Sequence, residues 1–131
     1  MSITNSVLTV GKINRQTFEH ELRPLNVPIL MKGQIDDWPA VTLSKTSDEA
    51  VIAYLKQQDN GNPAGAMLGD PAIKGEFFYG NSLKDYNFQR GFVPISLALD
   101  RLMEQRDKAT PHAVYIQSAP IRDHLPGFRA D

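Results

Sequence analysis

The stretch VPISLALDRLMEQRDKATPHAVYIQ, residues 93–117, joins a helix pattern to a strand pattern and decides the fold class. Pro94 suits the first position of a helix, where its missing N–H costs nothing. The apolar residues that follow at helical spacing are Ile95, Leu99, Leu102 and Met103. The segment Ala113 to Gln117 is typical of a strand, with Tyr115 and Gln117 on one face and Ile116 on the other. A helix that leads into a strand indicates a protein with both kinds of element.

Shorter elements are expected on the N-terminal side of this stretch. Asn14 can cap a helix that continues to Leu22 and that Arg23-Pro24 then ends. The apolar run Pro28 to Lys32 precedes a glycine and is typical of a buried strand. Asp36 to Pro39 has the composition of a turn around one large aromatic residue.

The middle of the chain predicts one helix and two strands. Thr46 and Glu49 have the spacing of a capping box, which starts a helix through Tyr54. Two strand-like pieces follow, Ala66 to Leu68 and Glu76 to Tyr79.

The strands near Leu30, Phe78 and Ile116 are expected to meet in one sheet, because each carries a short apolar run that must be buried. The sequence therefore predicts an α+β fold, with a small, mainly antiparallel sheet and flanking helices, in a single domain over residues 1–131.

Composition excludes several classes of function. The formal net charge of −1 leaves no excess of Lys or Arg to neutralise phosphates, so no nucleic-acid partner is expected. The chain has no cysteine, which excludes disulfides, thiolate metal sites and cysteine nucleophiles. The apolar runs are far shorter than the roughly 20 residues of a membrane span. We expect a soluble cytoplasmic protein with no membrane partner.

The three histidines do not form the pattern of a catalytic iron site. A facial-triad site needs two His and one carboxylate, commonly with a His-x-Asp/Glu pair. Leu22, Val114 and Pro126 stand two places after His20, His112 and His124, so none of the three begins such a pair. We expect no metal-binding and no catalytic residue in this chain.

Two aromatic segments have both a structural and a functional interpretation. The rings of Phe77-Phe78-Tyr79 either pack in the core or lie partly on a strand face that lines a groove. In the second case, the Tyr79 hydroxyl can form a hydrogen bond in the groove. Tyr115 and Gln117 lie on one face of their strand, where they are either exposed to solvent or line a polar pocket.

Six short motifs, in this order, resemble the N-terminal portion of the cupin-like, JmjC-related oxygenases. They are Pro28–Gly33, Asp37–Ala40, Gly75–Tyr79, Asn87-Phe88, Val93-Pro94 and Tyr115–Ser118. The group includes the asparaginyl hydroxylase that inhibits hypoxia-inducible factor. Its members fold as a double-stranded β-helix, or jelly roll, and use Fe(II), 2-oxoglutarate and O₂ to hydroxylate protein side chains or other substrates.

The resemblance implies a role for three residues. The tyrosine of the family's Tyr-x-Gln strand contacts 2-oxoglutarate, which implies that Tyr115 binds the co-substrate. The glutamine of that strand lies near the substrate, which implies a substrate-binding role for Gln117. The tyrosine of the Phe-Tyr motif lines the substrate groove, which implies the same for Tyr79.

The family's iron-binding His-x-Asp/Glu normally follows the segment that ends this sequence. The chain is therefore expected to be the N-terminal segment of a longer cupin-like oxygenase, inactive alone, with Fe(II) and 2-oxoglutarate bound only by the intact parent. The alternative is a free-standing, non-catalytic module that binds a ligand or a protein on the same scaffold. A homodimer through exposed strand edges at Pro28–Lys32 and Ala113–Gln117 is also expected.

Overall fold

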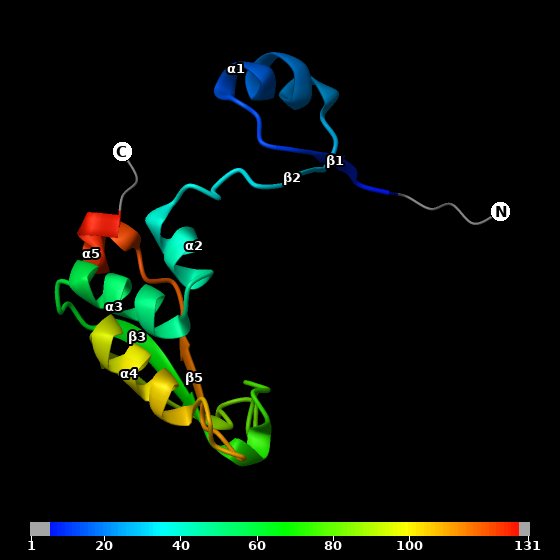
Figure 1. Cartoon of the computed structure of the whole chain (residues 1–131). Coiled ribbons are helices and arrows are strands. Elements are labelled where there is room, and N and C mark those ends of the chain that lie inside the picture. The colour runs from blue at the N-terminus through cyan, green and yellow to red at the C-terminus, as the bar shows by residue number, and fades with distance from the viewer. Residues whose placement is uncertain (1–5, 129–131) are drawn as a thin grey trace. The chain divides into compact units, whose positions relative to one another are not determined.

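The computed structural model describes residues 6–128, and the chain divides into two compact units, Met1–Thr42 and Leu43–Asp131. The division falls within helix α2, Pro39–Ser44. Helices and short strands alternate in both units (Figure 1), so the α+β prediction is confirmed. Among the helices of residues 6–128, none is both long and apolar enough to span a membrane.

The first unit is built on two short parallel strands, β1 (Leu8–Val10) and β2 (Ile29–Met31), in which Thr9 lies opposite Leu30. The connection between them is one helical segment in three parts: α1 (Arg15–Thr17), the π-helix η1 (Phe18–Leu22) and the 3₁₀-helix η2 (Arg23–Leu25).

The start of this helical segment is as predicted. The Asn14 side chain accepts a hydrogen bond from the Thr17 amide at 2.8 Å. The helix continues through Arg23-Pro24 to Leu25, because proline is tolerated in the first turn of the 3₁₀ segment. It ends at Asn26, which adopts the left-handed conformation with φ 50°.

The second unit contains a three-stranded antiparallel sheet with strand order β4-β3-β5. Its strands are β3 (Ala64–Gly69), β4 (Phe88–Val93) and β5 (Ala113–Ile116). The helices are α3 (Asp48–Gln58), α4 (Ile95–Gln105) and α5 (Ile121–His124), with 3₁₀ turns η3 (Pro71–Ile73) and η4 (Pro126–Phe128).

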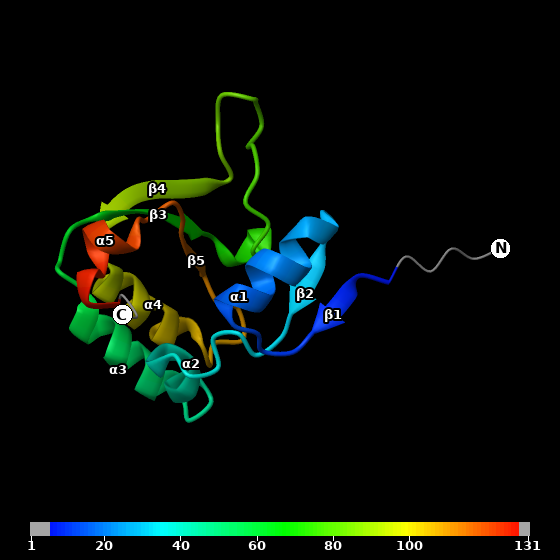
Figure 2. The same cartoon turned by 90° about the horizontal axis from the view of Figure 1, so that it is seen from above.

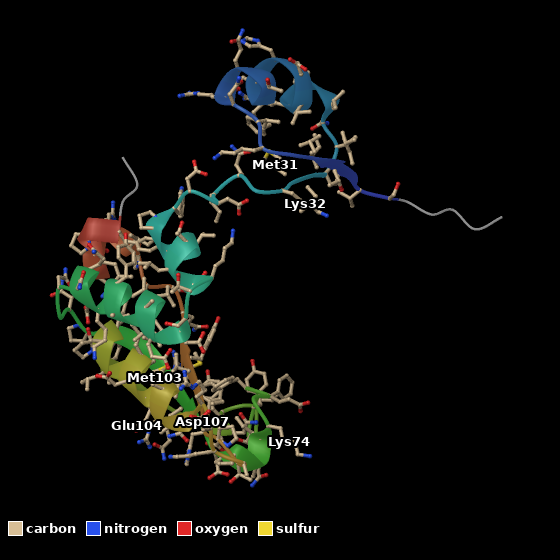
Figure 3. The ribbon with its side chains drawn as sticks, in the orientation of Figure 1. Met31, Lys32, Lys74, Met103, Glu104 and Asp107 are labelled. Carbon is tan, nitrogen blue, oxygen red and sulfur yellow. The ribbon has the colours of Figure 1, made fainter. Side chains whose placement is uncertain are left out.

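Helices α3 and α4 lie side by side on one face of this sheet (Figure 1). Two ion pairs connect the helices. Lys56 of α3 pairs with Asp100 of α4 at 2.6 Å, and Arg106, just after α4, pairs with Glu49 of α3 at 2.6 Å. The hydrogen bond from Arg106 is the largest of the effects that lower the pKa of Glu49. Figure 3 shows Glu104 on the last turn of α4, on the ribbon that packs over the sheet.

The core of the second unit is small. Among residues 6–128, the buried hydrophobic residues are Ala64 and Ala98, which are 2% and 5% exposed. Gln105 is 3% exposed, and its Oε1 accepts a hydrogen bond from the His112 amide at 3.1 Å. Gln105 thus ties the end of α4 to the start of β5.

The start of α4 is fixed by a carboxylate from another element. Asp59, just after α3, accepts hydrogen bonds from the amides of Ser96 at 2.7 Å and Gly61 at 3.0 Å. Burial alone would raise the pKa of Asp59, but these hydrogen bonds outweigh it and the pKa is lowered. Pro94 is extended, with ψ 146°, so it caps the helix and Ile95 is the first helical residue.

The prediction that the strands near Leu30, Phe78 and Ile116 share one sheet is wrong. Leu30 belongs to β2, which pairs with β1, and Ile116 belongs to β5, which pairs with β3. Phe78 lies in no strand, and its backbone forms hydrogen bonds with Asn87 within the same connection. The segment Glu76–Tyr79 takes part in one isolated bridge, between Tyr79 and Tyr86.

Two smaller predictions also need correction. The cap of α3 is Ser47 and not Thr46: Ser47 is extended and its hydroxyl accepts from the Ala50 amide at 3.0 Å. From their composition, Arg90 and Gly91 are expected to lie in a loop. They lie instead in β4, because their backbones pair with Met67 and Ala66 of the central strand.

Candidate functional site

The two faces of the three-stranded sheet differ in what covers them. Residues that pair across antiparallel strands lie on the same face. Ala66, Leu68 and Val114 line a gap together with Leu97 and Ala98 of α4, so this face packs under the helices. The alternate residues form the other face, which we call the open face. Its members are Gly65, Met67, Gly69, Phe88, Arg90, Phe92, Ala113 and Tyr115.

Tyr115 lies on the open face, as the period of two predicts. It pairs with Met67 of β3, which pairs on its other side with Arg90 of β4. These three residues form one row across the sheet, with Tyr115 on one edge strand and Arg90 on the other. The Tyr115 side chain is half exposed, at 47%. Tyr115 is therefore accessible to solvent.

A chain of aromatic contacts connects Tyr115 to Tyr79. The ring of Phe77 lies 5.9 Å from Tyr115 and 5.2 Å from Phe88. Phe88 lies 5.0 Å from Tyr86, which in turn stacks on Tyr79 at 6.0 Å and 18°. The structure therefore brings two of the three predicted site residues into one aromatic cluster, although Tyr79 is not in a strand.

The connection between β3 and β4 supplies most of this cluster and projects beyond the end of the sheet (Figure 2). Asn87 holds it together. Its Oδ1 accepts from the Phe78 amide at 2.9 Å and its Nδ2 donates to the Glu76 carbonyl at 2.8 Å. The backbone N–H of Asn87 also donates a hydrogen bond to the Phe78 carbonyl at 3.1 Å. One side chain thus fixes the segment that carries Phe77 to Tyr79.

Gln117, the third predicted residue, follows β5 and lines a hollow at the other end of the open face. The hollow has a volume of about 460 Å³, and Gln117 and Ser118 lie on one side of it with Arg90 and Phe92 on the other. Gly65 of the central strand also lines it. Gln117 and Tyr79 therefore lie at different parts of the same surface.

Arg90 was not predicted as a site residue. Its guanidinium carbon lies 5.5 Å from the centre of the Tyr86 ring, which is cation–π geometry. It also lines the hollow with Gln117. Had Phe88 to Val93 been interpreted as a strand, the period of two would have placed Arg90 on one face with Phe88 and Phe92.

Within residues 6–128, no three His, Cys, Asp or Glu side chains come together in a group that could hold a metal ion. His124 belongs to a structural contact, since its Nδ1 lies 3.1 Å from the Asn62 carbonyl. The donor set of these residues does not fit an iron site. The hydroxyl of Tyr115, the amide of Gln117 and the guanidinium of Arg90 are hydrogen-bonding groups and not the usual ligands of iron.

Comparison with protein families matches residues 15–131 to the family described as the cupin-like domain. The chain belongs to the cupin-like domain family. The match covers nearly all of the described residues and includes the open face and the β3–β4 connection of this cupin-like chain. No match to a protein with a curated description was found.

Membership confirms the broader part of the resemblance. All six motifs that suggested the cupin-like group lie inside or overlap the matched range. The structure distributes them over both units: Pro28–Gly33 contains β2, and Tyr115–Ser118 contains the end of β5.

Proposed function

We propose that this cupin-like chain is the N-terminal part of an Fe(II)- and 2-oxoglutarate-dependent oxygenase of the JmjC-related type. The observation that supports this most directly is the open face. It carries Tyr115 on the sheet, joins it to Tyr79 through aromatic contacts, and has a hollow lined by Gln117. These are the residues that the family resemblance assigns to the co-substrate and the substrate.

Each residue has a chemical role in this proposal. The Tyr115 hydroxyl donates a hydrogen bond to a carboxylate oxygen of 2-oxoglutarate, for which a phenol is well suited. The Gln117 amide both donates and accepts, so it can orient a polar substrate group. Tyr79 forms the aromatic wall of the substrate groove. The cytoplasmic location expected from the sequence suits an enzyme that depends on reduced iron.

Iron would supply the activation of O₂ in the intact enzyme. Because the described residues lack a fitting donor set, no step of the reaction is assigned to them, and their role is to hold and orient organic ligands. Purified chain should accordingly contain no stoichiometric iron.

The test uses the complete protein encoded by the gene, with succinate formation from 2-oxoglutarate as the readout. We expect Tyr115→Phe to raise the KM for 2-oxoglutarate about tenfold, the effect of losing one hydrogen bond to a charged group. Tyr54→Phe is the matched control, because Tyr54 packs on Phe128 at 6.1 Å and is not on the open face. Absence of 2-oxoglutarate turnover in the complete protein would refute the proposal.

A second candidate is a non-catalytic module that binds a ligand or a protein. It is supported by the way the aromatic cluster is assembled from residues 77–115 alone, with Asn87 holding the connection in place. A chain that binds the same ligands with no iron and no turnover would favour this candidate.

A further inference from the structure

Arg90 differs from most of the other arginines in its surroundings. Arg23, Arg101, Arg106 and Arg122 each lie within 4 Å of a carboxylate on a neighbouring residue or element. Among residues 6–128, no carboxylate forms an ion pair with Arg90, whose guanidinium instead lies over Tyr86. A guanidinium on a ring face keeps its N–H edges free to donate to a further group.

Arg90 lies between the two residues that the proposed function assigns to the substrate. It contacts Tyr86, which stacks on Tyr79, and it lines the hollow that Gln117 lines. Tyr115, which is assigned to the co-substrate, lies in the same row two strands away. At about 4.8 Å per strand spacing, their backbones are about 10 Å apart. A ligand that extends from Tyr86 along β4 toward the hollow passes Arg90.

A glycine of the central strand, Gly65, lines the hollow beside Arg90. A Cβ on Gly65 would meet Phe92 Cε1 at 4.0 Å, which is ordinary contact, and the backbone of Gly65 is not in the left-handed region. No backbone requirement at this position therefore calls for glycine. Its effect is to leave open space between Phe92, which is 79% exposed, and Gln117.

We propose that Arg90 binds the side-chain carboxylate of an aspartate or glutamate in a polypeptide substrate, and that the neighbouring part of this substrate lies over the hollow at Gly65. The inference rests on the proposed function for the assignment of Tyr79 and Gln117. Charge complementarity identifies the bound group, because the fork of N–H donors of Arg90 matches a carboxylate. Gln117 and Ser118 line the hollow and can form hydrogen bonds with the neighbouring part of the substrate, while Met67 lies beside Arg90 in the same row of the sheet.

The test measures binding of two acetylated, amidated nonapeptides to the full 131-residue chain by NMR titration. The peptides differ only in a central glutamate or glutamine. The glutamate peptide should bind about tenfold more tightly, as expected when a charge-assisted hydrogen bond replaces a neutral one. Arg90→Gln should abolish this preference, and Arg90→Lys should retain part of it. Gly65→Val should weaken the binding of both peptides, because its side chain narrows the hollow.

Arg122→Gln is the control, because Arg122 already pairs with Asp123 and lies on α5, outside the sheet. It should leave both affinities unchanged. Equal binding of the two peptides, no binding of either, or an unchanged preference in Arg90→Gln would each overturn the assignment. So would glutarate that binds more tightly than the glutamate peptide, because the hollow would then hold a free dicarboxylic acid. The proposed function fails separately, through absence of 2-oxoglutarate turnover.

Discussion

Replacing Asn87 with alanine should release the connection that carries Phe77 to Tyr79. The side chain forms two hydrogen bonds with backbone groups, at 2.9 Å to the Phe78 amide and at 2.8 Å to the Glu76 carbonyl. Each is worth about 0.5–1.5 kcal/mol net, and because both lie at exposed positions we take the lower half of the summed range, about 1–2 kcal/mol.

Loss of the two Asn87 hydrogen bonds should cause local opening of the connection and not global unfolding of the chain. About 1.4 kcal/mol corresponds to a tenfold change in an opening equilibrium, so hydrogen exchange of the Phe78 amide should accelerate about tenfold. The Val114 amide in β5 should keep its rate, because that strand pairs with β3 and not with the connection.

Asn81→Ala is the matched control, since Asn81 lies in the same connection and makes no hydrogen bond to another of the residues 6–128. It should leave exchange at Phe78 unchanged. If Asn87→Ala and Asn81→Ala gave the same exchange rate at Phe78, the reasoning that Asn87 holds this segment would be refuted.

Four further outcomes are expected. The pKa of Asp59 is lower in the folded chain than in the unfolded chain, so its carboxylate stabilises the fold above about pH 3.9. This stability is lost as the pH falls through the pKa of the folded chain. The free energy of urea unfolding should therefore depend less on pH between about 2 and 5 in Asp59→Asn than in the unchanged chain. Gln105→Ala should lower the free energy of unfolding by about 2 kcal/mol, because it leaves the His112 amide unpaired and opens a cavity, and an unchanged urea midpoint would contradict this. Light scattering over a dilution series should show a dimer formed through the strand edges at Pro28–Lys32 and Ala113–Gln117, whereas a monomer at high micromolar concentration would exclude it. Fe(II) with 2-oxoglutarate should leave the melting temperature of the isolated chain unchanged, and a rise of several degrees would disprove this.

Elements with a strong local pattern were predictable from the sequence. Helix α4 and strand β5 were found because apolar spacing in Ile95–Gln105 and alternation in Ala113–Ile116 are properties of the segments themselves. Strand β4 was missed because Arg90-Gly91 has the composition of a loop. Its strand state comes from pairing with β3, which a local pattern does not contain.

The segment Glu76–Tyr79 shows the opposite error. Its three aromatic residues favour a strand, but Lys74 and Gly75 have φ values of 50° and 81°, which turn the chain just before it. Its backbone groups then bond to Asn87 instead of a neighbouring strand of the sheet. No local pattern predicts that one asparagine side chain takes the place of a strand.

In the candidate site too, features set by a local sequence pattern were predictable, and features set by contacts between distant segments were not. That Tyr115 and Gln117 share a face follows from the period of two in a strand, and the structure places Tyr115 on the open face and Gln117 beside the hollow next to it. Arg90 was missed because its strand was missed. The aromatic contacts that join Tyr79 to this face depend on the course of the β3–β4 connection, which only the folded chain defines.

The central position of β3 has a consequence for synthesis of the chain. A ribosome completes Ala64–Gly69 before either neighbouring strand, and the second neighbour, Ala113–Ile116, follows only after the whole of α4. After β4 is synthesised and before β5 is synthesised, one edge of β3 has unpaired N–H and C=O groups, which can pair with another nascent chain. Slow translation between residues 94 and 112 should therefore increase aggregation, whereas the same delay placed before residue 64 should not.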